Sequence, residues 1–97
     1  MGQALYSRVY VSWAAQGWKV NATPSAWGNV WNGAGTYWAH KDEVRSRVGS
    51  SYYTSTIDSQ HECHLLGWPL SLPEYNFESW RPYVAPAWSL VAYRCNP

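Results

Sequence analysis

Two alternating segments near the N-terminus constrain the fold of this chain more than any other feature. Residues 5–13 and 17–23 alternate apolar with polar side chains, with Val9 and Val11 as the clearest apolar positions of the first segment. A period of two residues is typical of a half-buried β-strand. Ala15-Gln16-Gly17 is the predicted turn from the first segment into the second. Because a short turn between alternating segments favours antiparallel pairing, we predict a β-hairpin.

A helical spacing follows between Gly35 and Gly49. The residues at this spacing are Tyr37, Trp38, Lys41, Val44, Arg45 and Val48. Thr36 is a suitable N-cap, and Gly49 is a suitable residue just after the last turn. We therefore predict one helix over residues 37–48.

The remaining segments give weaker signals. Residues 57–66 alternate well enough to predict a third strand, and residues 68–73 are predicted as a loop bounded by prolines. Residues 86–94 begin with a proline and are predicted as a short helix, with a strand as the alternative. Together these elements predict an α+β fold, in which residues 1–97 form one small domain with an antiparallel sheet packed on one main helix.

The two cysteines supply the stabilisation that a small core lacks. A domain of 97 residues is marginal when held by its core alone. Cys63 and Cys95 are the only cysteines, and in a small, weakly charged chain such a pair is typical of one disulfide. Closing a loop of about 33 residues would contribute about 3–4 kcal/mol. We therefore predict a secreted or periplasmic protein, with this chain as the mature or C-terminal part of a longer secreted protein.

Charge patterning argues against two classes of partner. The net charge is +1, and the chain contains no run of Lys or Arg. The charges of Lys41, Asp42, Glu43, Arg45 and Arg47 are predicted to form one solvated helix face. Nucleic-acid binding requires a concentrated basic surface, so we expect no nucleic-acid partner. No apolar run approaches the roughly 18 residues of a membrane span, so we also expect no transmembrane segment.

Aromatic residues are unusually frequent. Eight Trp and eight Tyr stand among 97 residues, so some of them must reach the surface. Exposed Trp and Tyr side chains serve as platforms for sugars and other flat ligands because each combines an apolar body with a polar group. Trp68 and Trp80 are our candidates for such aromatic binding.

The stretch H-E-C-H, residues 61–64, resembles a metal site at first sight. If Cys63 is oxidised, however, the stretch loses its only soft donor. On a strand, His61 and His64 would point to opposite faces, so a two-histidine zinc site would require a helix or a sharp turn. We predict no metal ligands here and interpret His61 as a surface residue. The cofactor stays open, with a divalent cation as the candidate.

Three motifs resemble a known family. They are Gln60 followed by Cys63-His64, the segment Y-N-F-E-S-W-R-P over residues 75–82, and the closing C-N-P over residues 95–97. These resemble the Q-x-x-C-H, W-N-L-E-P-W-R-P and C-N-P elements of small secreted bacterial domains, catalogued as domain-of-unknown-function family twenty-five ninety-nine. Tyr, Phe and Ser replace Trp, Leu and the first Pro in the second element. The resemblance implies a secreted, disulfide-closed domain and brings no activity with it.

The ionisable residues of these motifs form the candidate catalytic cluster. His64, Glu78 and Arg81 would act as general base, its orienting or metal-binding partner, and anion clamp. A supporting polar pocket would consist of Asp58, Gln60 and Asn76. The structural alternative is a salt bridge between Glu78 and Arg81, with His64 bonded to a backbone carbonyl.

Two functions from different classes follow. The first is a secreted, extracytoplasmic antibacterial toxin or hydrolase that activates water against a cell-envelope component, such as a phosphate-bearing lipid-linked cell-wall precursor, with an immunity protein as a further partner. The alternative is a non-catalytic module rich in Trp and Tyr that binds glycan or a partner protein. A cleft lined by His64, Glu78 and Arg81 would favour catalysis, whereas exposed aromatics without such a cleft would favour binding.

Overall fold

The hairpin forms as the alternation predicts. The computed structural model describes residues 4–30, 34–66, 74–86 and 88. In it, β1 (Tyr6–Ala14) and β2 (Gly17–Pro24) pair antiparallel on either side of Ala15 and Gln16. Val11 lies opposite Val20 in this register, so the apolar side chains of the two strands share one face of the sheet.

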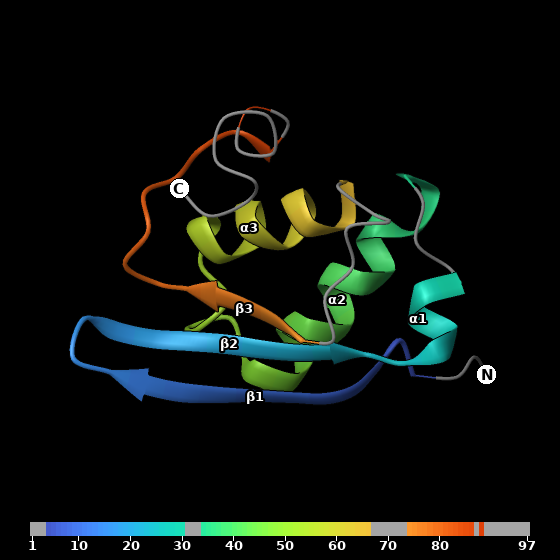
Figure 1. Ribbon diagram of the computed structural model, residues 1–97, viewed down its shortest axis with the longest axis horizontal. Coiled ribbons are helices and arrows are strands. Elements are labelled where there is room, and N and C mark those ends of the chain that lie inside the picture. The colour runs from blue at the N-terminus through green and yellow to red at the C-terminus, as the bar shows by residue number, and fades with distance from the viewer. Residues whose placement is uncertain (1–3, 31–33, 67–73, 87, 89–97) are drawn as a thin grey trace.

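A short third strand completes the sheet. β3 (Tyr75–Glu78) pairs antiparallel with β2, which gives the order β1-β2-β3. The helices α1 (Ala26–Val30), α2 (Tyr37–Val48) and α3 (Ser55–Leu66) and the 3₁₀ turn η1 (Ala34–Thr36) complete the described elements. α2 packs against β1 and α3 against β3, as Figure 1 shows. The predicted α+β class agrees with this arrangement. None of the described helices is long and apolar enough to cross a membrane.

The predicted helix over residues 37–48 is confirmed as α2. Gly49 ends it in a backbone conformation with φ of 90°, which favours glycine, and its N–H donates to the Arg45 carbonyl at 2.8 Å. Thr36 occupies the N-cap position as expected, but its side chain makes no capping hydrogen bond.

The predicted strand over residues 57–66 is wrong, because this segment is the second long helix, α3. Burial within this helix does not follow a single stripe: the odd-numbered residues 57–65 are all buried, and so is Gln60. Two further neighbours explain this pattern. The hydroxyls of Thr56 and Ser59 donate to the carbonyls of Arg81 and Val84, in the segment that follows β3. α3 is therefore covered by more than the sheet, and a helix covered on several sides lacks the single apolar stripe that reveals an amphipathic helix.

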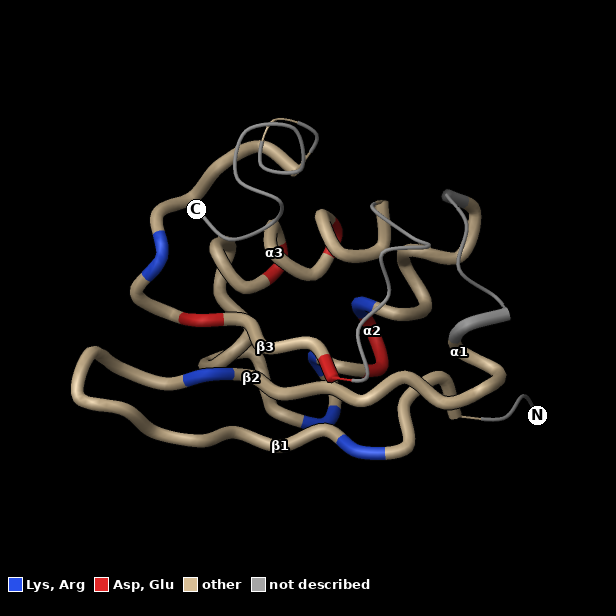
Figure 2. Tube along the Cα trace, in the orientation of Figure 1, with Lys and Arg blue, Asp and Glu red and all other residues tan. Residues whose placement is uncertain are grey.

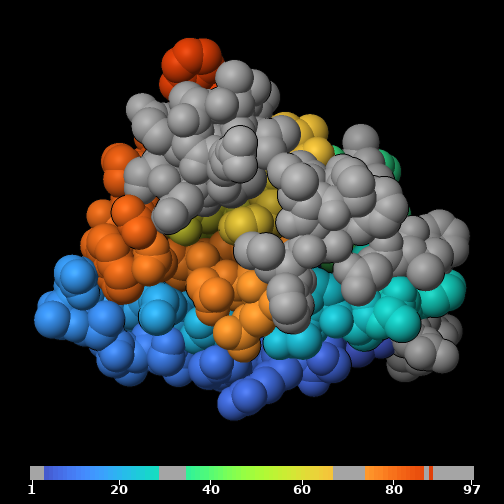
Figure 3. Space-filling view, viewed as in Figure 1, coloured from blue at the N-terminus to red at the C-terminus, as the bar shows by residue number. Residues whose placement is uncertain are grey.

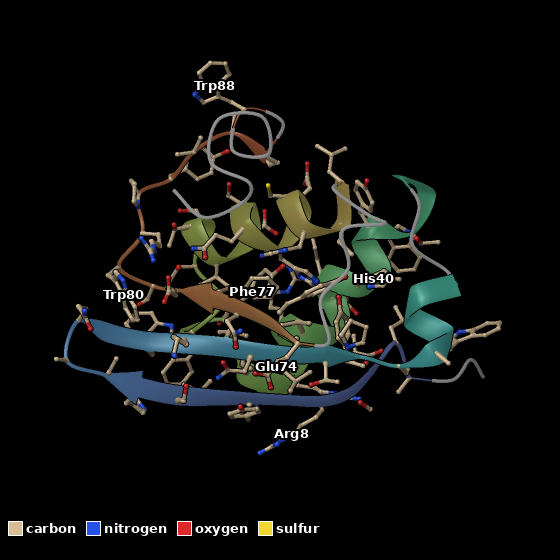
Figure 4. The ribbon with its side chains drawn as sticks, viewed as in Figure 1. Arg8, His40, Glu74, Phe77, Trp80 and Trp88 are labelled. Atoms are coloured by element: carbon tan, nitrogen blue, oxygen red, sulfur yellow. The ribbon has the colours of Figure 1, made fainter. Side chains whose placement is uncertain are left out.

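The core lies between the sheet and the two long helices. Its fully buried side chains include Val20, Val44, Ile57, Tyr75 and Phe77. In Figure 3 the atoms of β3 lie between those of the hairpin and those of α3. The opposite face of the sheet carries polar side chains, and the labelled Arg8 in Figure 4 projects away from the helices.

Several predictions fall outside the described residues. These are the loop over residues 68–73 with Trp68, most of the segment 86–94, and Cys95. Cys63 is fully buried in α3. Its pairing with Cys95 stays a prediction because Cys95 is not among the described residues.

Candidate functional site

Gln60 holds the end of β3 through its side-chain amide. Its Nε2 donates to the Glu78 carbonyl at 2.9 Å, and the Glu78 N–H donates to its Oε1, also at 2.9 Å. The same amide nitrogen reaches the Thr56 carbonyl within its own helix at 3.2 Å. The Gln60 amide thus bonds both backbone groups of Glu78, as a neighbouring strand would. Gln60, predicted as part of a polar pocket, is buried and fully engaged with backbone.

Glu78 and Arg81 form the ion pair that the structural alternative describes. The Nε of Arg81 donates to the Oε1 of Glu78 at 2.6 Å, and both side chains are partly buried. The Arg81 N–H also donates to the Glu78 carbonyl at 3.3 Å. This pairing fixes the turn after β3.

His64 contacts aromatic side chains of β3 rather than the side chains of this pair. Its ring stacks on Tyr75, with ring centroids 5.0 Å apart and planes 14° from parallel. Tyr75 and Phe77 are buried and face α3, so strand alternation directs Asn76 and Glu78 to the opposite face. Figure 4 shows Phe77 on the helix side of β3. The structure therefore brings Glu78 and Arg81 together but not His64 with them.

The predicted supporting pocket is also divided. Asp58 lies on α3 and faces α2, where its Oδ2 is 3.4 Å from the Nζ of Lys41. Asn76 is exposed and lies opposite Asn21 in the sheet. Because Gln60 points to the edge of β3, the three residues serve three separate places rather than one pocket.

His61 is fully buried, which corrects its assignment to the surface. Its Nε2 lies 2.6 Å from the hydroxyl of Tyr6, and its Nδ1 lies 2.8 Å from the hydroxyl of Tyr53. The Tyr6 hydroxyl also lies 2.9 Å from the Nδ1 of His40. If both facing nitrogens carried protons, the hydroxyl hydrogen of Tyr6 would have no acceptor among these three groups. The network therefore favours a state in which at least one of the two nitrogens that face Tyr6 carries no proton, so that at least one of these two histidines is neutral.

Burial sets the protonation of these groups. Desolvation lowers the pKa of His61 well below its usual range, and the nearby charges of His40, His64 and Lys41 act in the same direction. Burial also lowers the pKa of His64 to about 4. Burial raises the pKa of Tyr6. Both histidines are therefore neutral at pH 7.

The described residues contain no cluster of three or more metal-ligating side chains. Both nitrogens of His61 are already hydrogen-bonded, so it has no free donor for a metal. The carboxylates of Asp58 and Glu62, one turn apart, instead hold Lys41. Burial acts to lower the pKa of Lys41, but these two carboxylates outweigh it and raise the pKa.

The Lys41 contacts also correct the predicted solvated face of α2. Lys41 turns toward α3, and Glu43 turns toward the start of β1. Asp42 and Arg45 match the expectation as an exposed pair one turn apart, and Arg47 is exposed but bonds the Tyr6 carbonyl. Figure 2 shows acidic and basic residues interspersed along the fold rather than gathered.

An open cleft lies between α1 and α2, and we call it the Trp27–Trp38 cleft. Its volume is about 540 Å³. The lining side chains are Leu5, Trp27, Trp38, Ala39, Asp42, Glu43 and Ser46. Trp38 is 72% exposed and Trp27 is 39% exposed. The cleft thus combines aromatic walls with carboxylates, within the size range of small-molecule sites.

Local contacts fix the walls of the Trp27–Trp38 cleft. The Ser25 hydroxyl caps α1 by accepting the Gly28 N–H at 3.0 Å, and it donates to the Ala4 carbonyl. A Cβ at Gly28 would lie 2.0 Å from the Leu5 carbonyl oxygen, so only glycine allows α1 to approach this closely. The oxygens of Glu43 accept the N–H groups of Leu5 and Tyr6, each at 2.9 Å.

A second aromatic cluster lies at the turn end of the hairpin. Trp13, Trp18 and Tyr52 have ring centroids 5.7–6.0 Å apart and planes tilted by 59–81°. At these separations the rings contact one another and leave no gap for a ligand. Trp80, predicted as a binding residue, is partly buried and lies beside the same end of the hairpin in Figure 4. This cluster closes the hairpin rather than forming a cleft.

The sequence reasoning missed both Trp residues of the cleft. Ser25, three residues before Gly28, is a helix-start signal that could have placed Trp27 on a helix. Trp38 was assigned to the predicted helix without regard to its face. Trp38 and Asp42 are four residues apart, so their side chains are neighbours on the helix surface. The buried Val44 lies six residues from Trp38 and therefore on a different face of the helix.

Residues 8–97 match the model of a family described as a protein of unknown function, DUF2599. The chain belongs to this family. The match supports the resemblance drawn from the motifs and covers most of the chain. Neither the curated proteins nor the solved structures contain a match to it. The description of the DUF2599 family names no activity, substrate or partner.

Proposed function

We propose that this DUF2599 domain acts outside the cytoplasm as a non-catalytic module that binds glycan of the cell envelope in the Trp27–Trp38 cleft. The observation that carries the proposal is an open cleft with two exposed indoles and a carboxylate rim. An indole offers an apolar face to the C–H face of a sugar ring, and a carboxylate accepts hydrogen bonds from sugar hydroxyls.

The exposure of Trp38 supports this function. Leaving a large indole 72% exposed forgoes most of the 1.5–3 kcal/mol or so that burial of a large apolar side chain contributes. Among the described residues, Trp27 of α1 and Trp38 of α2 line the same cleft, where a ligand would cover both. The ordered backbone contacts at Ser25 and Glu43 mean that little has to move on binding.

Binding is measured with purified domain and soluble oligosaccharides, by calorimetry and by quenching of Trp fluorescence, with insoluble cell-wall glycan as a second ligand. Trp38→Ala removes the most exposed wall, and we expect at least a tenfold loss of affinity, about 1.4 kcal/mol. Trp13→Ala is the matched control, because Trp13 is 67% exposed but lies in the hairpin cluster. Equal affinity of both variants and the parent would refute the proposal.

A hydrolase that acts as an extracytoplasmic toxin is the second candidate, and His64 is the observation that favours it. Its imidazole is neutral at pH 7, which is the form that can take up a proton, but a pKa of about 4 makes it a weaker base than an ordinary histidine. The test is bacterial growth when the domain is exported, compared with export of His64→Phe, which keeps a ring against Tyr75. Toxicity that requires His64 would favour this candidate, and equal growth of both strains would reject it.

A further inference from the structure

The charge of the Trp27–Trp38 cleft restricts the glycan that it can accept, and this inference rests on the proposed function. Among the described residues, the lining includes two carboxylates, from Asp42 and Glu43, and no Lys or Arg. Arg45 and Arg47 bind these carboxylates without lining the cleft. An anionic polymer would therefore meet acidic groups and no basic partner at the lining.

The two carboxylates have different roles. Glu43 is committed to the fold, because one oxygen accepts the Leu5 N–H and the other accepts the Tyr6 N–H and lies 3.2 Å from Arg47. Glu43 contributes negative charge to the cleft, but both of its oxygens already accept backbone hydrogen bonds. Asp42 is 62% exposed and pairs with Arg45 through Oδ1 at 3.0 Å. Exposed pairs of this kind are weak, so Asp42 is able to turn toward a ligand.

Indoles beside carboxylates match one chemical group best. An ammonium group is attracted to the face of an indole and forms charge-assisted hydrogen bonds with carboxylates. We propose that the ligand is a glycan with free, protonated amino groups, that is, a chain containing hexosamine without its acetyl groups. Asp42 would accept the ammonium hydrogens while Trp38 and Trp27 cover the sugar ring.

A pair of ligands that differ only in acetylation tests the inference. Oligomers of glucosamine and of N-acetylglucosamine with the same length are titrated into the domain in a slightly acidic buffer that protonates the amines. We expect the glucosamine oligomer to bind about tenfold tighter, as a cation–π contact and one charge-assisted bond together suggest. Added salt should reduce the difference, because Asp42 is exposed.

Two variants separate the contributions. Asp42→Asn keeps the shape of the side chain and removes its charge, so the preference for the glucosamine oligomer over the acetylated one should fall severalfold. Trp38→Ala should weaken both oligomers, and Trp13→Ala should weaken neither. Circular dichroism confirms that each variant is folded.

The outcomes distinguish this inference from the proposed function. Equal binding of both oligomers, tighter binding of the acetylated one, or an unchanged preference in Asp42→Asn would overturn the amine assignment and leave glycan binding standing. Tighter binding of an anionic glycan such as heparin would overturn it as well. If no oligosaccharide binds the parent domain, both the proposed function and this inference fall.

Discussion

Mild acid should destabilise this domain, because His61 and His64 are buried in a form that resists protonation. In the unfolded chain both histidines have the ordinary pKa of 6.5, whereas in the fold the pKa of His64 is about 4 and that of His61 lies well below 6.5. Below pH 6.5 the unfolded state therefore binds more protons than the folded state. The contribution of these two histidines to the free energy of unfolding is fully present above pH 6.5 and is lost as pH falls toward the folded pKa values.

The magnitude follows from the size of these pKa shifts. Each histidine contributes a loss of about 1.4 kcal/mol for every pH unit below 6.5. At pH 5 the loss is about 2 kcal/mol for His64, and His61 adds to it in the same direction. Small domains unfold with only about 5–15 kcal/mol, so this loss is a large fraction of the total.

The assay is urea denaturation followed by Trp fluorescence at several pH values between about 7.5 and 5. This range lies above the usual pKa of most carboxyl groups, so they contribute little to the slope. His64→Phe is the informative variant, because phenylalanine keeps an aromatic ring against Tyr75 and cannot titrate. We expect its unfolding free energy to depend on pH less steeply than that of the parent.

Two results would contradict this reasoning. The first is an unfolding free energy that stays constant between pH 7.5 and 5, which would mean that the histidines protonate freely in the fold. The second is a parent-like slope in His64→Phe, which would assign the acid sensitivity to other groups. A lower stability of the variant at every pH, with a reduced slope, would still support the linkage.

Three further predictions concern the fold. Gln60→Ala leaves the backbone N–H and carbonyl of Glu78 without their side-chain partner, so urea denaturation should show a loss of about 2–4 kcal/mol. Gly28→Ala should lower the melting temperature and weaken ligand binding because its Cβ collides with backbone, whereas Gly35→Ala has open space and should leave both unchanged. If the two cysteines are bonded, mass spectrometry without reductant should give the reduced mass minus two hydrogens; the full reduced mass would refute the disulfide.

The site shows how far motifs can be trusted. The motif residues Gln60 and Glu78 do meet, but through an amide and the backbone rather than in a catalytic pocket. Motif membership gave no information on the face to which each side chain points. That depends on strand alternation: Tyr75 faces the helices, and Glu78, three residues later, faces away.

Elements whose signals come from neighbouring residues could be predicted from the sequence. The β1–β2 hairpin follows from a period of two and a short turn, and α2 follows from its spacing and Gly49, because neighbouring residues alone produce these signals. The helix α3, the burial of His61 and the Trp27–Trp38 cleft depend on tertiary contacts. α3 is buried on several sides, which removed its helical stripe, and the ring nitrogens of His61 are bonded by Tyr53 and by Tyr6, which comes from the distant strand β1. The Trp27–Trp38 cleft exists only because α1 and α2 meet at Leu5, a contact between residues far apart in sequence that no local pattern encodes.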